Sequence, residues 1–303
     1  MSFVKAAVAA VAVLASATTP AAVRPPSVNF AALTVYAVGP TDNYVAEWTG
    51  VGGNWTVIGG AANHVYAGSA GVFATDPTSG DIWQYDGTPG EWTVIGGPGN
   101  EFAEGGGHLY GLGPDDAYVA EYDGTPGSWT IIRNQSTGNI YAGTYGLFAI
   151  AKDGLGDLVH YNGTPNSWTN IGSGSVSNVA VGTSAVYAAS INCLTVSEWN
   201  SGTGWEEIGP LHSGDCIDGL VAGGDGLVID DQTTATSDLY GGSPYKWTVI
   251  NTSPYLLPDA ISPTYIYGFS LVNGTTNVDL YSGSGTQWDV IGGAATPPLA
   301  AGD

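Results

Sequence analysis

One stretch recurs along the chain: Tyr85-Asp86-Gly87-Thr88-Pro89-Gly90-Glu91-Trp92-Thr93-Val94-Ile95-Gly96-Gly97. Close copies occupy residues 122–132 and 161–172, and looser copies occupy residues 48–60, 199–209, 240–250 and 281–293. Each copy carries a tryptophan at the same place, before its last apolar residues, and these seven are Trp55, Trp92, Trp129, Trp168, Trp205, Trp247 and Trp288. Successive tryptophans are 37, 37, 39, 37, 42 and 41 residues apart. Recurrence at this period indicates a repeat protein with seven units.

Each unit contains four short segments with the composition of β-strands. In the second unit these segments are residues 63–67, 72–75, 81–85 and 91–95, which are rich in β-branched and aromatic residues. Glycine, proline and aspartate lie between them, as tight turns require. The pattern predicts a four-stranded antiparallel meander, and seven meanders predict an all-β, seven-bladed β-propeller.

The two ends of the chain are expected to lie outside the ring. Residues 1–22 resemble a signal peptide, with Lys5 before an apolar run and cleavage expected after Ala17, or alternatively after Ala22. Residues 23–293 are assigned to a single propeller, and residues 294–303 to a loose tail. The first unit has its own inner strand near residues 27–31, so ring closure is expected without exchange of a strand between the termini.

Two packing roles follow from the repeat. Small residues on the innermost strands, such as Ala67-Gly68, Ala142-Gly143 and Ala222-Gly223, suit a crowded axis where the blades converge. The repeated fourth-strand tryptophan is expected to pack against the next blade.

The charge and the leader peptide limit the possible partners and the location. The net charge is −22, with only five lysines and arginines, so phosphate backbones and anionic membranes should be repelled. After the leader, no apolar run approaches the roughly 20 residues that a membrane span needs. The sequence predicts a secreted, extracellular protein with no nucleic-acid partner and no membrane insertion.

A disulfide between Cys193 and Cys216 is predicted. Cys193 falls in the loop between the second and third strands of unit five, and Cys216 in the connection from unit five to unit six. In a meander these two segments lie on the same face, and an oxidising compartment favours the bond.

The sequence offers little support for catalysis or a cofactor. The histidines His64, His108, His160 and His212 are scattered over different units, and no nucleophile, phosphate-loop or zinc motif is present. No catalytic residue, metal ligand or cofactor is therefore assigned. Paired aspartates are interpreted as turn residues, with calcium as the alternative: Asp76 and Asp81, Asp115 and Asp116, Asp153 and Asp157, Asp230 and Asp231.

A series of polar residues on the third strands is the best candidate for a functional site. The polar residue precedes the repeated aromatic in units one to five: Glu47-Trp48, Gln84-Tyr85, Glu121-Tyr122, His160-Tyr161 and Glu198-Trp199. Units six and seven have Leu239 and Leu280 instead. Because side chains alternate along a strand, each polar residue shares a blade face with the apolar residue two positions earlier. A polar group is therefore expected in each cleft, near an aromatic ring, which is a suitable arrangement for binding a sugar. The alternative is exposure at the blade edge, or a hydrogen bond to the backbone of the next blade.

The repeat resembles those of secreted bacterial and fungal propeller proteins and, more distantly, the propeller lectins of the tachylectin and tectonin kind. The likeness rests on Tyr-Asp-Gly-Thr-Pro-Gly-x-Trp-Thr-x-Ile-Gly-Gly, Ile140-Tyr141-Ala142-Gly143, Gly146-Leu147-Phe148-Ala149 and His108-Leu109-Tyr110-Gly111-Leu112. It covers roughly residues 27–293. No sugar-contact motif of those lectins can be transferred position by position.

The sequence thus favours a multivalent carbohydrate-binding propeller whose partners are glycans or glycoproteins. Repeated weak sites in the clefts would gain avidity from being linked. Two alternatives remain: an extracellular scaffold that binds proteins through one face of the disc, and a propeller glycoside hydrolase or lyase.

Overall fold

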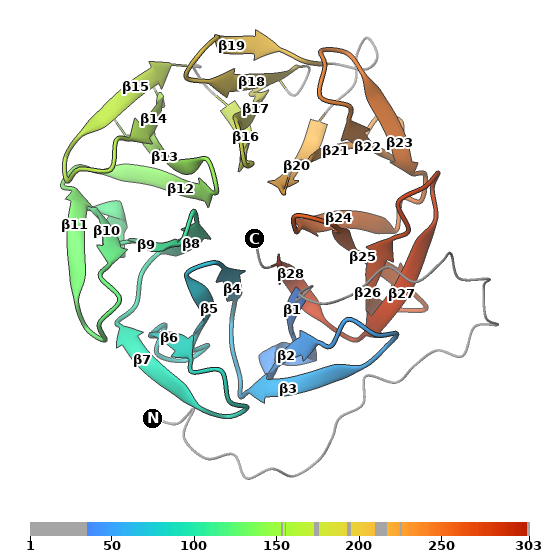
Figure 1. The fold of residues 1–303 in the computed structure, drawn as a ribbon, viewed down its shortest axis with the longest axis horizontal. Helices are drawn as coiled ribbons and strands as arrows, with labels where there is room; N and C mark the ends of the chain where they lie inside the picture. The colour runs from blue at the N-terminus through green and yellow to red at the C-terminus, as the bar shows by residue number, and fades with distance from the viewer. Residues whose placement is uncertain are drawn as a thin grey trace.

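The computed structural model describes residues 35–152, 154, 156–172, 176–192, 195–209, 217–224 and 226–301. This part of the chain forms seven antiparallel sheets of four strands each. Figure 1 shows the sheets arranged as blades in a ring, with one strand of each blade nearest the axis and one at the rim. The predicted seven-bladed β-propeller is confirmed.

The strands follow the chain from blade to blade. Blade 1 contains β1 (Val35–Val38), β2 (Val45–Trp48), β3 (Trp55–Gly59) and the C-terminal β28 (Thr296–Ala301). Blade 2 contains β4 (Val65–Gly68), β5 (Gly71–Thr75), β6 (Ile82–Tyr85) and β7 (Trp92–Gly96). Blade 3 contains β8 (Glu101–Gly105), β9 (His108–Leu112), β10 (Val119–Tyr122) and β11 (Trp129–Arg133). Blade 4 contains β12 (Thr137–Gly143), β13 (Gly146–Ala151), β14 (Leu158–Tyr161) and β15 (Trp168–Gly172).

The remaining blades have the same order. Blade 5 contains β16 (Val176–Val181), β17 (Val186–Ser190), β18 (Val196–Asn200) and β19 (Gly204–Glu207). Blade 6 contains β20 (Ile217–Gly223), β21 (Gly226–Asp231), β22 (Thr236–Tyr240) and β23 (Trp247–Asn251). Blade 7 contains β24 (Leu256–Ile261), β25 (Ile266–Val272), β26 (Thr275–Tyr281) and β27 (Trp288–Gly293). Two short 3₁₀ turns, η1 (Pro40–Asp42) and η2 (Pro114–Asp116), are the helical elements found, and no helix in the described ranges is long and apolar enough to cross a membrane.

Ring closure differs from the expectation. Residues 296–301, expected to be part of a loose tail, form β28, the innermost strand of blade 1, which pairs antiparallel with β1. The C-terminal strand and the N-terminal strands therefore share one sheet, as Figure 1 shows near the axis. The prediction failed because Pro297 and Pro298 cannot donate ladder hydrogen bonds. They lie where the register shifts between Tyr36 and Val38, and proline is tolerated at a bulge or on an edge strand.

The repeated tryptophans clamp each blade to the preceding one, so the prediction that they pack against the next blade is wrong. The indole Nε1 of Trp92 donates to the carbonyl oxygen of Ile58 in blade 1 at 2.8 Å. The Gly90 N–H donates to the same oxygen at 2.8 Å, and its φ of 86° explains the glycine. The other six indoles make the equivalent bond at 2.8–3.0 Å, to Ile291, Ile95, Ile132, Ile171, Ile208 and Ile250.

The blades converge on small residues at the axis, as predicted. A Cβ added to Gly143 would lie 2.4 Å from the carbonyl oxygen of Val181 on the neighbouring inner strand. Carboxylates also link the inner strands. Glu101 accepts the Ile140 N–H at 3.0 Å, and Asp259 accepts the Leu299 N–H of β28. Burial raises the pKa of Glu101 to about 7 and that of Asp259 to about 6.

The raised pKa of Glu101 predicts that the protein loses stability as the pH rises. The folded state favours the protonated carboxyl, so the contribution is fully present below the ordinary pKa of 4.5 and is lost as the pH rises through about 7. Glu101→Gln keeps an oxygen for the Ile140 N–H and removes the charge. We expect it to raise the free energy of unfolding by about 3 kcal/mol at pH 8, with no gain at pH 4.

Urea titrations of the wild type and Glu101→Gln at the two pH values check this expectation. Glu91→Gln, at an exposed position, is the matched control for the loss of one negative charge. Equal gains from both variants at pH 8 would show that net charge, and not burial, is responsible.

Several predictions concern residues outside the described ranges. These are the signal peptide and the disulfide between Cys193 and Cys216, whereas the inner strand of blade 1 expected near residues 27–31 is β28 instead. The signal peptide and the disulfide remain predictions.

Candidate functional site

The third strands position the polar series as the alternation predicted. Val45, Ile82, Val119, Leu158 and Val196 are fully buried, each two positions before a member of the series. Glu47, Gln84, Glu121, His160 and Glu198 follow on the same blade faces and are half-buried. Each of these faces meets the next blade: Val45 packs in one cluster with Val65 and Trp83 of blade 2, and the other four apolar residues pack in the same way with residues of the blade that follows.

Each polar residue lies beside the third-strand aromatic of the next blade. The Tyr122 hydroxyl donates to Gln84 Oε1 at 3.4 Å, and Tyr240 donates to the Glu198 carboxylate. Burial and, to a smaller extent, the charge of Glu47 raise the pKa of Tyr85. Burial and the charge of Glu121 raise the pKa of Tyr161 in the same way. The ring centroids of His160 and Trp199 are 5.8 Å apart. The predicted residues are therefore brought together in pairs across the clefts, and the partner of Glu198 is Tyr240, which was not among them.

Burial and hydrogen bonding act in opposite directions on these carboxyls. Burial raises the pKa of Glu47, while the Tyr36 hydroxyl, which donates to its Oε1 at 3.5 Å, lowers it. Glu198 behaves in the same way with Tyr240 as the donor. Each of these carboxylates accepts a hydrogen bond from a tyrosine hydroxyl. A carboxylate has about four acceptor sites, so it can still accept hydrogen bonds from a ligand.

Two of the predicted site residues, His160 and Trp48, are packed against other side chains or held by the backbone. The imidazole of His160 stacks on Phe148 with centroids 4.6 Å apart, and Tyr145 lies parallel to it at 6.3 Å. Burial lowers the pKa of His160, which favours the neutral ring. Trp48 is only 2% exposed, and its Nε1 donates to the Gly52 carbonyl at 2.7 Å. The clefts at these two residues are filled by protein side chains.

The cleft between blades 2 and 3 is open. It holds a cavity of about 360 Å³, lined by Ala70, Phe73, Gln84, Gly107, His108, Leu109, Glu121, Tyr122, Asp123 and Gly124. The turns between β4 and β5 and between β6 and β7 lie on this side of the disc. Ala70 has the same place in its turn, next to Gly71, that Tyr145 has next to Gly146 in blade 4. A small side chain at this position leaves the cleft open, and a tyrosine fills the other cleft.

A close contact between an imidazole and a carboxylate at this cavity was not anticipated. His108 Nδ1 lies 2.6 Å from Glu121 Oε1, and the His108 side chain is 51% exposed. The imidazole also stacks on Tyr110 with centroids 5.9 Å apart. The contact could have been found from the expected strand pairing. His108 is the first residue of β9, and β9 pairs with β10, which carries Glu121. The cavity thus combines carboxylate, imidazole, amide and phenol groups.

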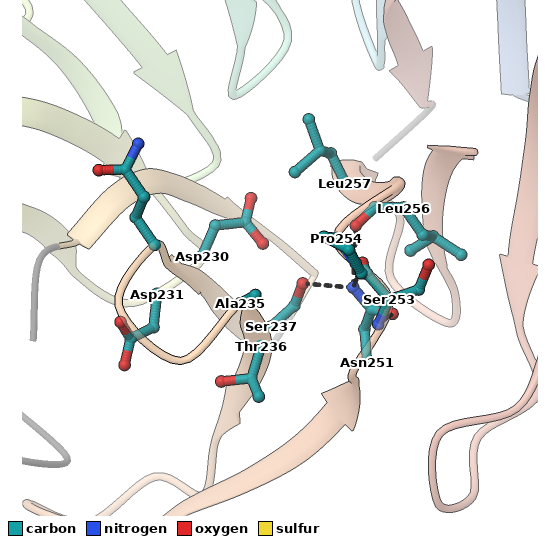
Figure 2. Close-up of a pocket in the computed structure, with 11 residues that line it drawn as sticks. Asp230, Asp231, Ala235, Thr236, Ser237, Asn251, Ser253, Pro254, Leu256 and Leu257 are labelled. Atoms are coloured by element: carbon teal, nitrogen blue, oxygen red, sulfur yellow. Dashed lines mark hydrogen bonds between the residues drawn. The ribbon is translucent and has the colours of Figure 1, made fainter. Parts of the chain in front are cut away.

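A second cavity, of about 270 Å³, lies between blades 6 and 7 on the opposite face of the disc. Figure 2 shows Asp230 and Asp231 on one side and Pro254, Leu256 and Leu257 on the other. The wall with the aspartates is acidic, and the wall with Pro254, Leu256 and Leu257 is apolar. Asp230 and Asp231 are among the paired aspartates interpreted from the sequence as turn residues, with calcium binding as the alternative.

Two of the paired aspartates, Asp76 and Asp231, act as turn residues. Asp76 Oδ1 accepts the N–H groups of Thr78 and Ser79 at 2.7 and 2.8 Å, and Asp231 Oδ1 accepts those of Thr233 and Thr234. Among the residues the structure describes, no group of three or more histidine, cysteine or acidic side chains is placed to hold a metal ion. Asp153 lies outside them.

No protein-family model and no curated protein sequence matches the chain. Solved structures match in fold. Prp20p from Saccharomyces cerevisiae has a TM-score of 0.57 at 11% identity, over 88% of this chain and 86% of that chain. YCF48 from Cyanidioschyzon merolae has a TM-score of 0.55 at 11% identity, over 78% and 88%. Virginiamycin B lyase from Staphylococcus aureus has a TM-score of 0.53 at 11% identity, over 78% and 91%. These likenesses establish the propeller fold alone.

Proposed function

We propose that this protein is a secreted carbohydrate-binding propeller whose main site is the open cleft between blades 2 and 3. One observation carries the proposal: a cavity of about 360 Å³ in which Gln84 and Tyr122 approach from adjacent blades. Cavities of about 300–1,000 Å³ with a few convergent polar groups are typical of small-ligand sites.

The chemistry of the lining suits a sugar. The Gln84 amide can donate and accept, Asp123 and Glu121 accept, and hydroxyl groups of a sugar need both kinds of partner. The rings of Tyr122 and Phe73 provide apolar surface for the C–H groups of a pyranose. With a net charge of −22, the protein should prefer neutral glycans to sulfated or uronic ones.

Multivalency is part of the proposal. Glu47 with Tyr85, Glu121 with Tyr161, and Glu198 with Tyr240 repeat a polar-aromatic pair in other clefts. Weak binding there would add avidity toward a surface that carries many copies of one glycan.

A glycan array, followed by calorimetric titration of the best ligand, tests the site. We expect Ala70→Tyr to fill the cavity as Tyr145 fills its own cleft, and to weaken binding at least about tenfold, or 1.4 kcal/mol. Thr164→Tyr, in an exposed turn of blade 4, places the same ring away from the cavity and should leave affinity unchanged. An array without hits, or equal affinity of Ala70→Tyr and wild type, would reject the proposed site.

A further inference from the structure

Blade 7 exposes an apolar surface on the face of the disc opposite the proposed glycan cleft. Tyr255, Leu257 and Leu271 are 66%, 58% and 51% exposed, and we call these three residues the blade 7 patch. The Leu271 N–H donates to the Tyr255 carbonyl at 2.8 Å, so the two residues are direct neighbours across strands. Leu257 of β24 pairs with Phe269 of β25, and Leu271 lies two positions after Phe269 on that strand, so Leu257 and Leu271 share one face of blade 7.

The patch continues into the cavity between blades 6 and 7. Leu257 belongs to both, and Pro254 and Leu256 extend the apolar wall inward. In Figure 2 the Asp230 carboxylate points across the cavity toward this wall. The back of the cavity is fixed, because the Asn251 amide donates to Ser237 Oγ at 3.1 Å and to the Leu256 carbonyl at 2.8 Å.

We propose that the blade 7 patch and this cavity form a docking surface for a partner protein segment that carries a lysine or arginine beside apolar side chains. The aliphatic stem of a basic side chain packs along an apolar wall while its charged end remains near a carboxylate. The cavity offers the apolar wall at Leu256 and Leu257 and the negative charge at Asp230. The neighbouring apolar side chains of the partner would cover Tyr255 and Leu271.

The charge of the whole molecule selects the same occupant. A net charge of −22 attracts a basic partner and repels a second copy of this chain. The proposal is independent of the proposed glycan site, because the cavity opens at the β21–β22 turn and the β23–β24 connection, on the other face of the disc.

The test uses fluorescently labelled short peptides of alternating leucine and lysine, with counterparts in which glutamate replaces lysine or serine replaces leucine. Fluorescence anisotropy should show binding of the leucine-lysine peptide alone, weakened by added salt. The double variant Leu257→Ser with Leu271→Ser should bind the peptide about tenfold more weakly, because it removes most of the apolar surface that the peptide would bury. Asp230→Asn should lose about threefold.

The matched control is Val94→Ser with Ile131→Ser, which removes two exposed apolar residues from the rim and should change affinity less than about twofold. Absence of peptide binding, or binding that Leu257→Ser with Leu271→Ser leaves intact, overturns the proposal. A concentration-dependent dimer that this double variant abolishes also overturns it, because the occupant would then be a second copy.

Discussion

A chain that ends at Gly293 is expected to lose its cooperative folded state. The truncation removes β28, which supplies the inner strand of blade 1 and buries Leu299 and Ala300. It also leaves β1 with an unpaired edge and Asp259 without the Leu299 N–H. These losses together should approach the whole stability of an ordinary domain, about 5–15 kcal/mol.

Differential scanning calorimetry of the truncated chain checks this prediction. A chain that lacks only Gly302 and Asp303 keeps β28 and should unfold as the full chain does. A synthetic peptide of residues 294–303 should restore part of the transition by adding back the strand. A truncated chain that melts cooperatively at the temperature of the full chain would contradict the closure through β28.

Trp92→Ala is expected to destabilise the protein by about 3–5 kcal/mol, as for other buried tryptophans. The ring is 8% exposed, lies 5.2 Å from the Tyr85 ring between centroids, and caps the Ile58 carbonyl of the preceding blade. Trp92→Phe keeps much of the ring and removes only the N–H. It should cost less, with about 1 kcal/mol from the hydrogen bond, because Gly90 still serves the Ile58 oxygen.

Urea denaturation of the two variants separates packing from hydrogen bonding. Val94→Ala, at an exposed position on the same strand, is the control and should stay within about 0.5 kcal/mol of wild type. A loss below about 1 kcal/mol for Trp92→Ala would be too small for a buried clamp between blades.

The period of the tryptophans was enough to predict the number of blades and, in blade 2, each strand to within two residues. It could not show the direction of the clamp. The alternation of side chains along β7 is the same whether the face that carries Trp92 meets blade 1 or blade 3. Only the handedness of the ring decides which of the two blades that face meets. Closure was missed for a local reason, since Pro297 and Pro298 argue against a strand unless a bulge is known to lie there.

The candidate site was predictable in its pairs but not in its openness. Alternation along β6 placed Gln84 in a cleft with an aromatic ring expected nearby, and the structure identifies that ring as Tyr122 of blade 3. Whether a cleft holds a cavity depends on a residue that is distant in sequence from the polar series. This residue is Ala70 in blade 2 and Tyr145 in blade 4. That difference depends on side-chain volume at a turn, which a repeat pattern does not reveal.

The most direct measurement is a crystal structure of the protein soaked with the glycan that binds best. We expect electron density for a sugar in the cavity between blades 2 and 3, within hydrogen-bond distance of Gln84 and against the ring of Tyr122. Crystals of Ala70→Tyr should show no sugar at this position. An empty cavity in the wild type under conditions where the glycan binds in solution would contradict the proposed site.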